Sequence, residues 1–190
     1  MRLAIYGGTF DPIHEAHLAV AREAVRACAL DRVLFIPAAH PPHKAGATRA
    51  DYEDRYHMVG LACAGETAFE PSRLEAGEER SYSIRTIEKV RTGLDPASEL
   101  FFLIGADAFA EICTWRRWRD VVRLAEFIVV SRPGHHYDAP EGARVRRLET
   151  LEMPVSSSEI RRRLALGDYS VPVPPAVLDY IRKRGLYRGA

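Results

Sequence analysis

Short apolar runs alternate with segments of helical periodicity along this chain, and the alternation constrains its fold more than any other feature. We expect five strands, at residues 3–6, 33–36, 68–70, 100–104 and 127–130. Between them, the spacing of apolar residues predicts helices over residues 16 to about 29, 51 to about 64 and 83–91. The run Leu100–Ile104 is apolar throughout, as a strand buried on both faces should be. Strands and helices in this order predict an α/β fold: a doubly wound parallel sheet with helices on both faces.

The last third of the chain departs from this alternation. Residues 145–148 form a short expected strand, and Ser156 begins an S-x-x-E capping box that opens a helix ending near Gly167. Prolines then precede a last helix, over residues 176 to about 184. No linker-like stretch sets these elements apart, so we expect residues 1–190 to form a single domain with a helical C-terminal segment.

The balance of charges favours a small-molecule ligand. The 190 residues carry a formal net charge of +1, which does not suit a broad nucleic-acid or anionic-membrane surface. No apolar run approaches the roughly 20 residues that cross a bilayer. The three cysteines, Cys28, Cys63 and Cys113, lie far apart in helical-looking contexts and are interpreted as reduced core thiols. We therefore expect a cytoplasmic protein that binds neither nucleic acid nor membrane, and the sequence leaves a homo-oligomer possible.

The richest local signal is the stretch GGTFDPIHEAH at residues 7–17, which joins the first expected strand to the first helix. Gly7 and Gly8 allow a sharp turn and let a ligand approach backbone N–H groups closely. His14 and His17, three residues apart, lie at the start of the helix, where free N–H groups and the helix dipole favour an anion. This arrangement suits phosphoryl or nucleotidyl transfer. Two other interpretations remain open: capping or core histidines, and a metal pair assisted by Asp11.

A second anion site is predicted where SSSEIR begins the helix after residue 155. Serine hydroxyls and free N–H groups stand at its mouth, and Arg161 lies about one turn in, where a guanidinium makes paired contacts with phosphate. The alternative is an ordinary helix cap with solvated arginines. Neither the G-x-G-x-x-G fingerprint nor the P-loop motif occurs, so phosphates have to be held in another way.

Weaker signals cluster around the expected ligand. The loop at residues 41–44, PPHK, presents the cation Lys44. The fourth strand ends in Gly105-Ala106-Asp107, and if it neighbours the first strand, both glycine loops face one crevice at the switch point of the sheet. Trp115 offers an aromatic face beside it, whereas Trp118 is interpreted as sheet packing. Arg132 follows the fifth strand and would reach the same edge.

These motifs together resemble a known family. GGTFDPIHEAH is similar to the HxGH signature of nucleotidyltransferases, and SSSEIR to their second signature. Further matches run nearly end to end: PPHK at 41–44, SYSIRT at 81–86, IGADA at 104–108, Trp115, RPG at 132–134 and GLY at 185–187. The chain therefore resembles the bacterial nicotinate mononucleotide adenylyltransferases, which have a Rossmann-like fold and join ATP to nicotinate mononucleotide, giving deamido-NAD and pyrophosphate.

The resemblance implies roles for particular residues. It implies that the ATP phosphates are contacted by His14, His17, Lys44 and Arg161. Further ATP-binding positions would be Gly7, Gly8, Thr9, Phe10, Gly105, Asp107, Arg132, Ser156 and Ser157. The pyridine mononucleotide would bind at Trp115, Ser83 and Thr86. No dedicated protein ligand for a metal is expected, since Mg²⁺ would arrive with ATP.

The chain departs from the family pattern at three positions. Ala16 stands where glycine is usual, and Ser158 replaces threonine. Arg85 occupies a position where an acidic or amide residue is usual, which affects the substrate contacts expected there.

Three rival functions fit parts of the pattern. A pantetheine-phosphate adenylyltransferase shares the fold and a similar second signature, but usually has threonine where His14 stands. A non-catalytic nucleotide-binding regulator could use the same fold, although both histidines and Arg161 are retained here. A metal-binding protein would use His14, His17 and Asp11.

Overall fold

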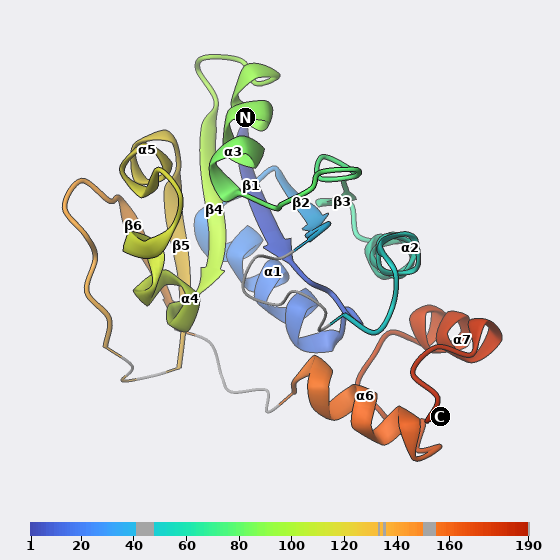
Figure 1. Ribbon diagram of the computed structural model, residues 1–190. Coiled ribbons are helices and arrows are strands. Elements are labelled where there is room, and N and C mark those ends of the chain that lie inside the picture. The colour runs from blue at the N-terminus through green and yellow to red at the C-terminus, as the bar shows by residue number, and fades with distance from the viewer. Residues whose placement is uncertain (41–47, 133, 135, 150–154, 190) are drawn as a thin grey trace.

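The computed structural model describes residues 1–40, 48–132, 134, 136–149 and 155–189. Its centre is a sheet of six strands in the order β3-β2-β1-β4-β5-β6, with every neighbouring pair parallel (Figure 1). The strands are β1 (Arg2–Gly8), β2 (Arg32–Pro37), β3 (Phe69–Pro71), β4 (Glu99–Gly105), β5 (Glu126–Ser131) and β6 (Val145–Glu149). The predicted doubly wound parallel sheet is confirmed.

The order of the strands reverses at β1, which creates the switch point. From β1 the chain first moves to β2 and β3, and then returns to place β4 on the other side of β1. The register pairs Ala4 with Val33 on one side and with Phe101 on the other. Gly8 and Gly105 therefore end neighbouring strands at the carboxyl end of the sheet, as the expectation of two glycine loops at the switch point requires.

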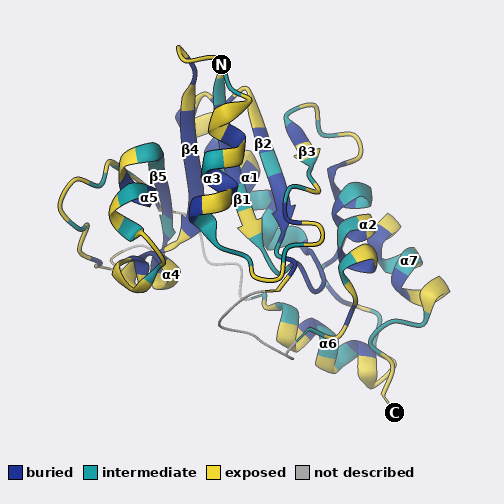
Figure 2. Ribbon diagram, turned by 45° about the horizontal axis from the view of Figure 1, so that its top comes forward, coloured by how far each residue is buried: buried dark blue, intermediate teal, exposed yellow. Residues whose placement is uncertain are grey.

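Alternate residues of the strands point to opposite faces of the sheet and pack into two separate hydrophobic cores. Ala4 of β1 packs in a core formed with α1 (Glu15–Cys28), α2 (Tyr52–Cys63), α6 (Ser157–Ala165) and α7 (Pro175–Arg184). Its neighbours Leu3 and Ile5 pack in the opposite core, with α3 (Ser83–Thr92), α4 (Ala106–Ala110), a 3₁₀ turn at Ile112–Thr114 and α5 (Trp118–Leu124). Figure 2 shows the result: buried strands between helices whose outer sides are exposed.

The C-terminal helices lie at the functional end of the sheet. Figure 1 shows α6 and α7 at the end of the molecule toward which the arrows of β1 and β4 point. Ile160 and Leu164 of α6, and Val177 and Ile181 of α7, are buried in the same core as α1. These helices are thus part of the fold's main body, and they close the region beyond the strand ends.

Two expectations from sequence require correction. The helices α4 and α5 were not predicted, because each is short and the stretch between them is rich in arginine. Cys28 and Cys63 are buried, and burial raises the pKa of the Cys63 thiol to about 12. Cys113, by contrast, is exposed in the 3₁₀ turn, so its assignment as a core thiol was wrong. No helix among the described residues is long and apolar enough to span a membrane.

Candidate active site

A cavity of about 210 Å³ opens at the switch point. Its apolar floor comes from the sheet, with Ile5 and Ile36 on one side and Phe102 and Ile104 on the other. Six of the residues singled out in the sequence line this one cavity: Gly7, Gly8, Thr9, Ser83, Thr86 and Trp115. The sheet therefore brings the glycine turn and the residues expected to bind the mononucleotide to a single place.

The glycine turn is shaped by an aromatic ring beneath it. A Cβ atom on Gly8 would lie 2.8 Å from Cζ of Phe10, so no larger residue fits there. Phe10 itself has a φ of 49° and is buried, with its ring near those of Tyr6, Phe35 and His17. Its side chain supports the turn from the core and does not line the cavity.

The two histidines lie together at the start of α1. Their rings stack with centroids 3.7 Å apart. The backbone N–H of His14 donates to Nδ1 of His17 at 3.2 Å, so a neutral His17 ring carries its proton on Nε2 and is a donor there. His14 is the N-cap residue of α1 and is buried, and this burial lowers the pKa of its imidazole to about 4. His14 is therefore neutral at pH 7 and combines the capping interpretation with a place beside His17.

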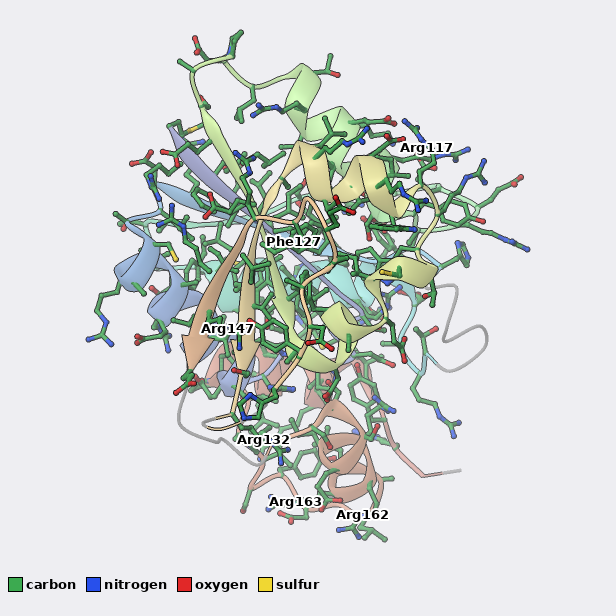
Figure 3. The ribbon with its side chains drawn as sticks, turned by 90° about the vertical axis from the view of Figure 1, so that its left-hand side faces the viewer. Arg117, Phe127, Arg132, Arg147, Arg162 and Arg163 are labelled. Atoms are coloured by element: carbon green, nitrogen blue, oxygen red, sulfur yellow. The ribbon has the colours of Figure 1, made fainter. Side chains whose placement is uncertain are left out.

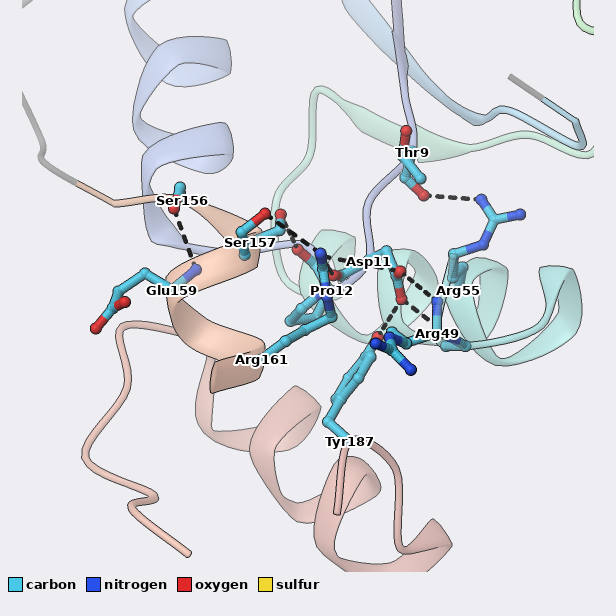
Figure 4. Close-up of polar contacts among 12 residues, drawn as sticks. Thr9, Asp11, Pro12, Arg49, Arg55, Ser156, Ser157, Glu159, Arg161 and Tyr187 are labelled. Atoms are coloured by element: carbon cyan, nitrogen blue, oxygen red, sulfur yellow. Dashed lines mark hydrogen bonds and ion pairs between the residues drawn. The ribbon is translucent and has the colours of Figure 1, made fainter. Parts of the chain in front are cut away.

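Asp11 is the most connected polar residue of the site, a role that sequence reasoning missed (Figure 4). Its buried carboxylate accepts hydrogen bonds from the backbone N–H groups of Arg49 (2.8 Å) and Ala50 (3.1 Å) and from the Tyr187 hydroxyl (2.7 Å). Burial raises the pKa of Tyr187, with a further contribution from the charge of Asp11. Asp11 thus joins the turn after β1 to the segment before α2 and to the C-terminal segment.

Helix α6 docks on the same turn through its first residues. Nη1 of Arg161 donates to the backbone carbonyl of Asp11 at 2.8 Å, and the Ser157 hydroxyl donates to the carbonyl of Pro12 at 3.1 Å. The Ser156 hydroxyl accepts from the backbone N–H of Glu159 at 3.2 Å, which is an ordinary N-cap. Ser158 accepts from Arg161 at 3.3 Å. The two signature motifs, 145 or more residues apart in sequence, therefore lie in direct contact.

A buried arginine that the sequence analysis did not single out supports the turn from behind. Arg55 of α2 is 2% exposed. Its Nη1 donates to the carbonyls of Thr9 and Ala38, each at 2.8 Å, and so ties the loop after β1 to the loop after β2. Its Nε is buried without a hydrogen-bond partner among the described residues. Desolvation lowers the pKa of this guanidinium, opposed chiefly by the charge of Asp11.

The remaining described residues that the sequence analysis predicted lie outside the cavity. Gly105 ends β4 and Asp107 lies in the first turn of α4, while neither lines the cavity. Arg132 directly follows β5, on the side of the molecule where α6 lies (Figure 3). Figure 3 also shows Arg162 and Arg163 on α6, where each pairs with a neighbouring carboxylate. Lys44 falls outside the described residues.

The tryptophans and Arg85 take different positions at the acceptor side. Trp115 is half-buried, lines the cavity and meets the Phe102 ring edge-on at 6.0 Å. Trp118 is the first residue of α5, packs against the core from there and does not line the cavity. Arg85 is exposed and pairs with Glu78 at 3.2 Å. Arg85 is also absent from the lining of this cavity.

The geometry does not support the metal-binding alternative. Among the described parts of the chain, no three His, Cys, Asp or Glu side chains come together as a metal-binding group. Both oxygens of the Asp11 carboxylate already accept hydrogen bonds from other groups of the protein. His14 and His17, with Asp11, therefore do not form the ligand set that this alternative requires.

Comparisons with known proteins agree with this arrangement. The cytidylyltransferase-like family matches residues 5–163. A protein of Solibacter usitatus named probable nicotinate-nucleotide adenylyltransferase is 64% identical over 187 residues, covering 98% of this chain and 100% of the relative. A protein of the same name from Thermus thermophilus is 44% identical over 191 residues, covering 99% and 100% of the two chains.

Solved structures share the fold. The nicotinic acid mononucleotide adenylyltransferase of Plasmodium falciparum, complexed with NaAD, superimposes with a TM-score of 0.79 at 22% identity. The match covers 98% of this chain and 97% of that chain. A putative nicotinate-nucleotide adenylyltransferase of Vibrio parahaemolyticus gives a TM-score of 0.71 at 22% identity, covering 100% and 96%.

The Asp11 network generates a prediction about stability. Replacing Tyr187 by Phe removes one hydrogen bond to a buried carboxylate, and we expect this to lower the free energy of unfolding by about 1.5 to 3 kcal/mol. Urea denaturation of both proteins measures the difference. Tyr169→Phe is the matched control, because that hydroxyl lies outside this network and its removal should cost little. Equal stabilities for Tyr187→Phe and the native protein would contradict the role given to this bond.

Proposed function

The chain belongs to the cytidylyltransferase-like family, among relatives named nicotinate-nucleotide adenylyltransferase, and we propose that its site transfers the adenylyl group of ATP to nicotinate mononucleotide. The products are deamido-NAD and pyrophosphate, a step of NAD biosynthesis. One observation carries the proposal: the turn after β1 is bonded to the start of α6 through the carbonyls of Asp11 and Pro12, and Gly7, Gly8 and Thr9 of the same turn line the cavity together with Trp115. A phosphate-binding half and an acceptor half thereby share the residues of one turn.

The reaction needs no nucleophile from the protein. An oxygen of the mononucleotide phosphate attacks the α-phosphorus of ATP and forms a new P–O bond, while the bond from that phosphorus to the bridging oxygen of the β-phosphate breaks. The electron pair leaves with pyrophosphate. Catalysis then consists of holding the two substrates in line and stabilising the negative charge of the transferring group.

We assign that charge stabilisation to the stacked histidines and to cations around them. The Nε2–H of His17 would donate to the α-phosphate as charge builds, with His14 alongside. Arg161 and Lys44 would hold the β- and γ-phosphates that leave. Arg161 is suited to this because only part of its guanidinium is engaged, by the Asp11 carbonyl and Ser158, and 23% of its side chain is exposed.

Further ATP contacts are proposed for residues around the same turn. Backbone groups of Gly7, Gly8 and Thr9 would lie against the nucleotide, and Ser157 stands at the mouth of α6. Asp107, beyond the end of β4, would lie near a ribose. Mg²⁺ is proposed to enter with ATP, held mainly by the substrate's phosphates and water, and to neutralise part of their charge.

The acceptor half is proposed to bind the pyridine ring. Trp115 presents its half-buried ring to the cavity, and Ser83 and Thr86 line it from the first turn of α3. Among the described residues no side chain caps the N-terminus of α3, so its N–H groups favour a negative substituent such as the nicotinate carboxylate. These features favour a pyridine mononucleotide over phosphopantetheine, which has no ring to stack on Trp115.

An assay of products tests the reaction and the acceptor together. With ATP and Mg²⁺, we expect the purified protein to convert nicotinate mononucleotide to deamido-NAD, measured by chromatography, with pyrophosphate released in equal amount. Nicotinamide mononucleotide and phosphopantetheine serve as competing acceptors. Faster turnover of phosphopantetheine would assign the chain to the rival adenylyltransferases. No pyrophosphate release with any acceptor would favour a non-catalytic regulator.

Replacing His17 by Ala should affect the rate more than binding. The His17 donor acts where charge develops in the transition state, and losing one such donor typically lowers kcat by about 10²- to 10³-fold. We expect the KM for ATP to change much less. Steady-state kinetics on the folded variant measure both constants. An unchanged kcat would restrict His17 to its contacts at the start of α1.

Replacing Trp115 by Ala should weaken the binding of the acceptor mononucleotide. Stacking on an aromatic ring is worth roughly 1 to 3 kcal/mol per base, so the KM for the mononucleotide should rise by about ten- to a hundredfold while that for ATP stays nearly constant. Trp118→Ala is the control, because Trp118 packs on the core and lies outside the cavity. That variant should lose thermal stability and show no selective change in KM. Normal acceptor binding by Trp115→Ala would remove Trp115 from the site.

A further inference from the structure

Glu75 is the only charged side chain among the described residues that line the acceptor cavity. It lies between β3 and α3 and is 8% exposed. Its Oε1 accepts a hydrogen bond from the Thr86 hydroxyl at 2.7 Å. Its Oε2 is buried and has no hydrogen-bond partner among the described residues. One oxygen of this carboxylate is therefore without a hydrogen-bond partner among the described residues, in a residue of the wall of a ligand-sized cavity.

Such a group is costly to keep in a folded protein. A buried carboxylate that lacks a partner loses its hydration, and proteins normally pair such charges or bond every oxygen. The Tyr52 hydroxyl is also buried without a hydrogen-bond partner in the described parts of the chain, so it does not donate to Glu75. The cavity floor of Ile5, Phe102 and Ile104 offers no donor. A positive charge in the cavity would therefore stabilise the Glu75 carboxylate through its field.

The proposed acceptor carries a suitable charge. The pyridine nitrogen of nicotinate mononucleotide is bonded to ribose, so the ring is a pyridinium cation. A cationic ring is attracted both by an aromatic face, which Trp115 provides, and by a carboxylate nearby. Neutral rings of the same shape gain the stacking contact alone.

We infer that Glu75 is the countercharge of the pyridinium ring and a specificity-determining residue of the acceptor site. The inference rests on the proposed function and adds to it a reason for selecting the charged ring. The charge of Glu75 attracts the ring nitrogen, while the N–H groups at the start of α3 favour the carboxylate substituent. Through Oε1, Glu75 holds the Thr86 side chain in the same wall of the cavity.

Two ligands that differ in ring charge test this. Nicotinate mononucleotide and its 1,4-dihydro form share the ribose, phosphate and carboxylate, but the dihydropyridine ring is neutral. Titration calorimetry gives the Kd of each. We expect Glu75→Gln, which keeps an oxygen for Thr86, to raise the Kd of the charged form by about tenfold. The Kd of the neutral form should stay within about twofold of the native value.

Glu78→Gln is the matched control. Glu78 lies three residues away and pairs with Arg85 and Lys89 outside the cavity, so the same substitution there should leave both Kd values unchanged. Glu75→Asp keeps the charge and should keep the preference for the pyridinium ring even if both ligands bind more weakly. Glu75→Asp also keeps the inference testable if Glu75→Gln is unfolded at the temperature of the assay.

A preference for the charged ring that persists in Glu75→Gln would overturn the inference, whether or not both ligands are weakened together. In that case Glu75 would act only through Thr86. Failure of the proposed function gives a different result, since the native protein would then bind neither mononucleotide and form no dinucleotide from them.

Discussion

The carboxylate of Asp11 holds together the parts of the chain from which the site is made. It is 2% exposed, and its bonds reach the segment before α2 and the Tyr187 hydroxyl beyond α7, while its backbone carbonyl accepts from Arg161 of α6. Each partner lies at least 38 residues away in sequence. A buried carboxylate has to be satisfied, so these segments are obliged to converge on the turn after β1. Arg161 reaches the same turn through the backbone carbonyl of Asp11 and lies 3.9 Å from the carboxylate.

A second buried charge fixes the other side of the same turn. Arg55 bonds to the carbonyl of Thr9 and to that of Ala38, so the loops after β1 and β2 are spaced by one rigid, planar group. Loop carbonyls at a cavity edge would otherwise face solvent and move. Arg55 and Asp11 thus explain how a turn containing Gly7 and Gly8, which are intrinsically flexible, presents fixed N–H groups to a ligand.

Sequence reasoning captured the fold and the motifs that act locally. The apolar runs identify five of the six strands, because buried parallel strands carry a strong apolar signal, and the sixth was expected separately at residues 145–148. The lining residues Gly8 and Trp115 were found because each stands at or after the end of a strand in a recognisable pattern, whereas Ser83 was found through the resemblance of SYSIRT to the family. Glu75 was missed, since it stands in an irregular segment and becomes informative only when Thr86 is seen bonded to it. The roles of Arg55 and Tyr187 were missed for the same reason. Each depends on a hydrogen bond to a residue far away in sequence, which the local pattern does not reveal.

The two halves of the site are consequently held in different ways. The acceptor cavity is built mostly on β1, β2, β4 and the first turn of α3, whose positions are set by the sheet and its apolar core. The phosphate side depends on hydrogen bonds between the turn after β1 and α6, which the sheet does not position. Sites built on strands and helices are more precise than sites on loops, which suits the flat ring proposed to bind in the cavity. A change in the C-terminal segment therefore acts first on the phosphate side, because Tyr187 reaches Asp11 and not the cavity wall.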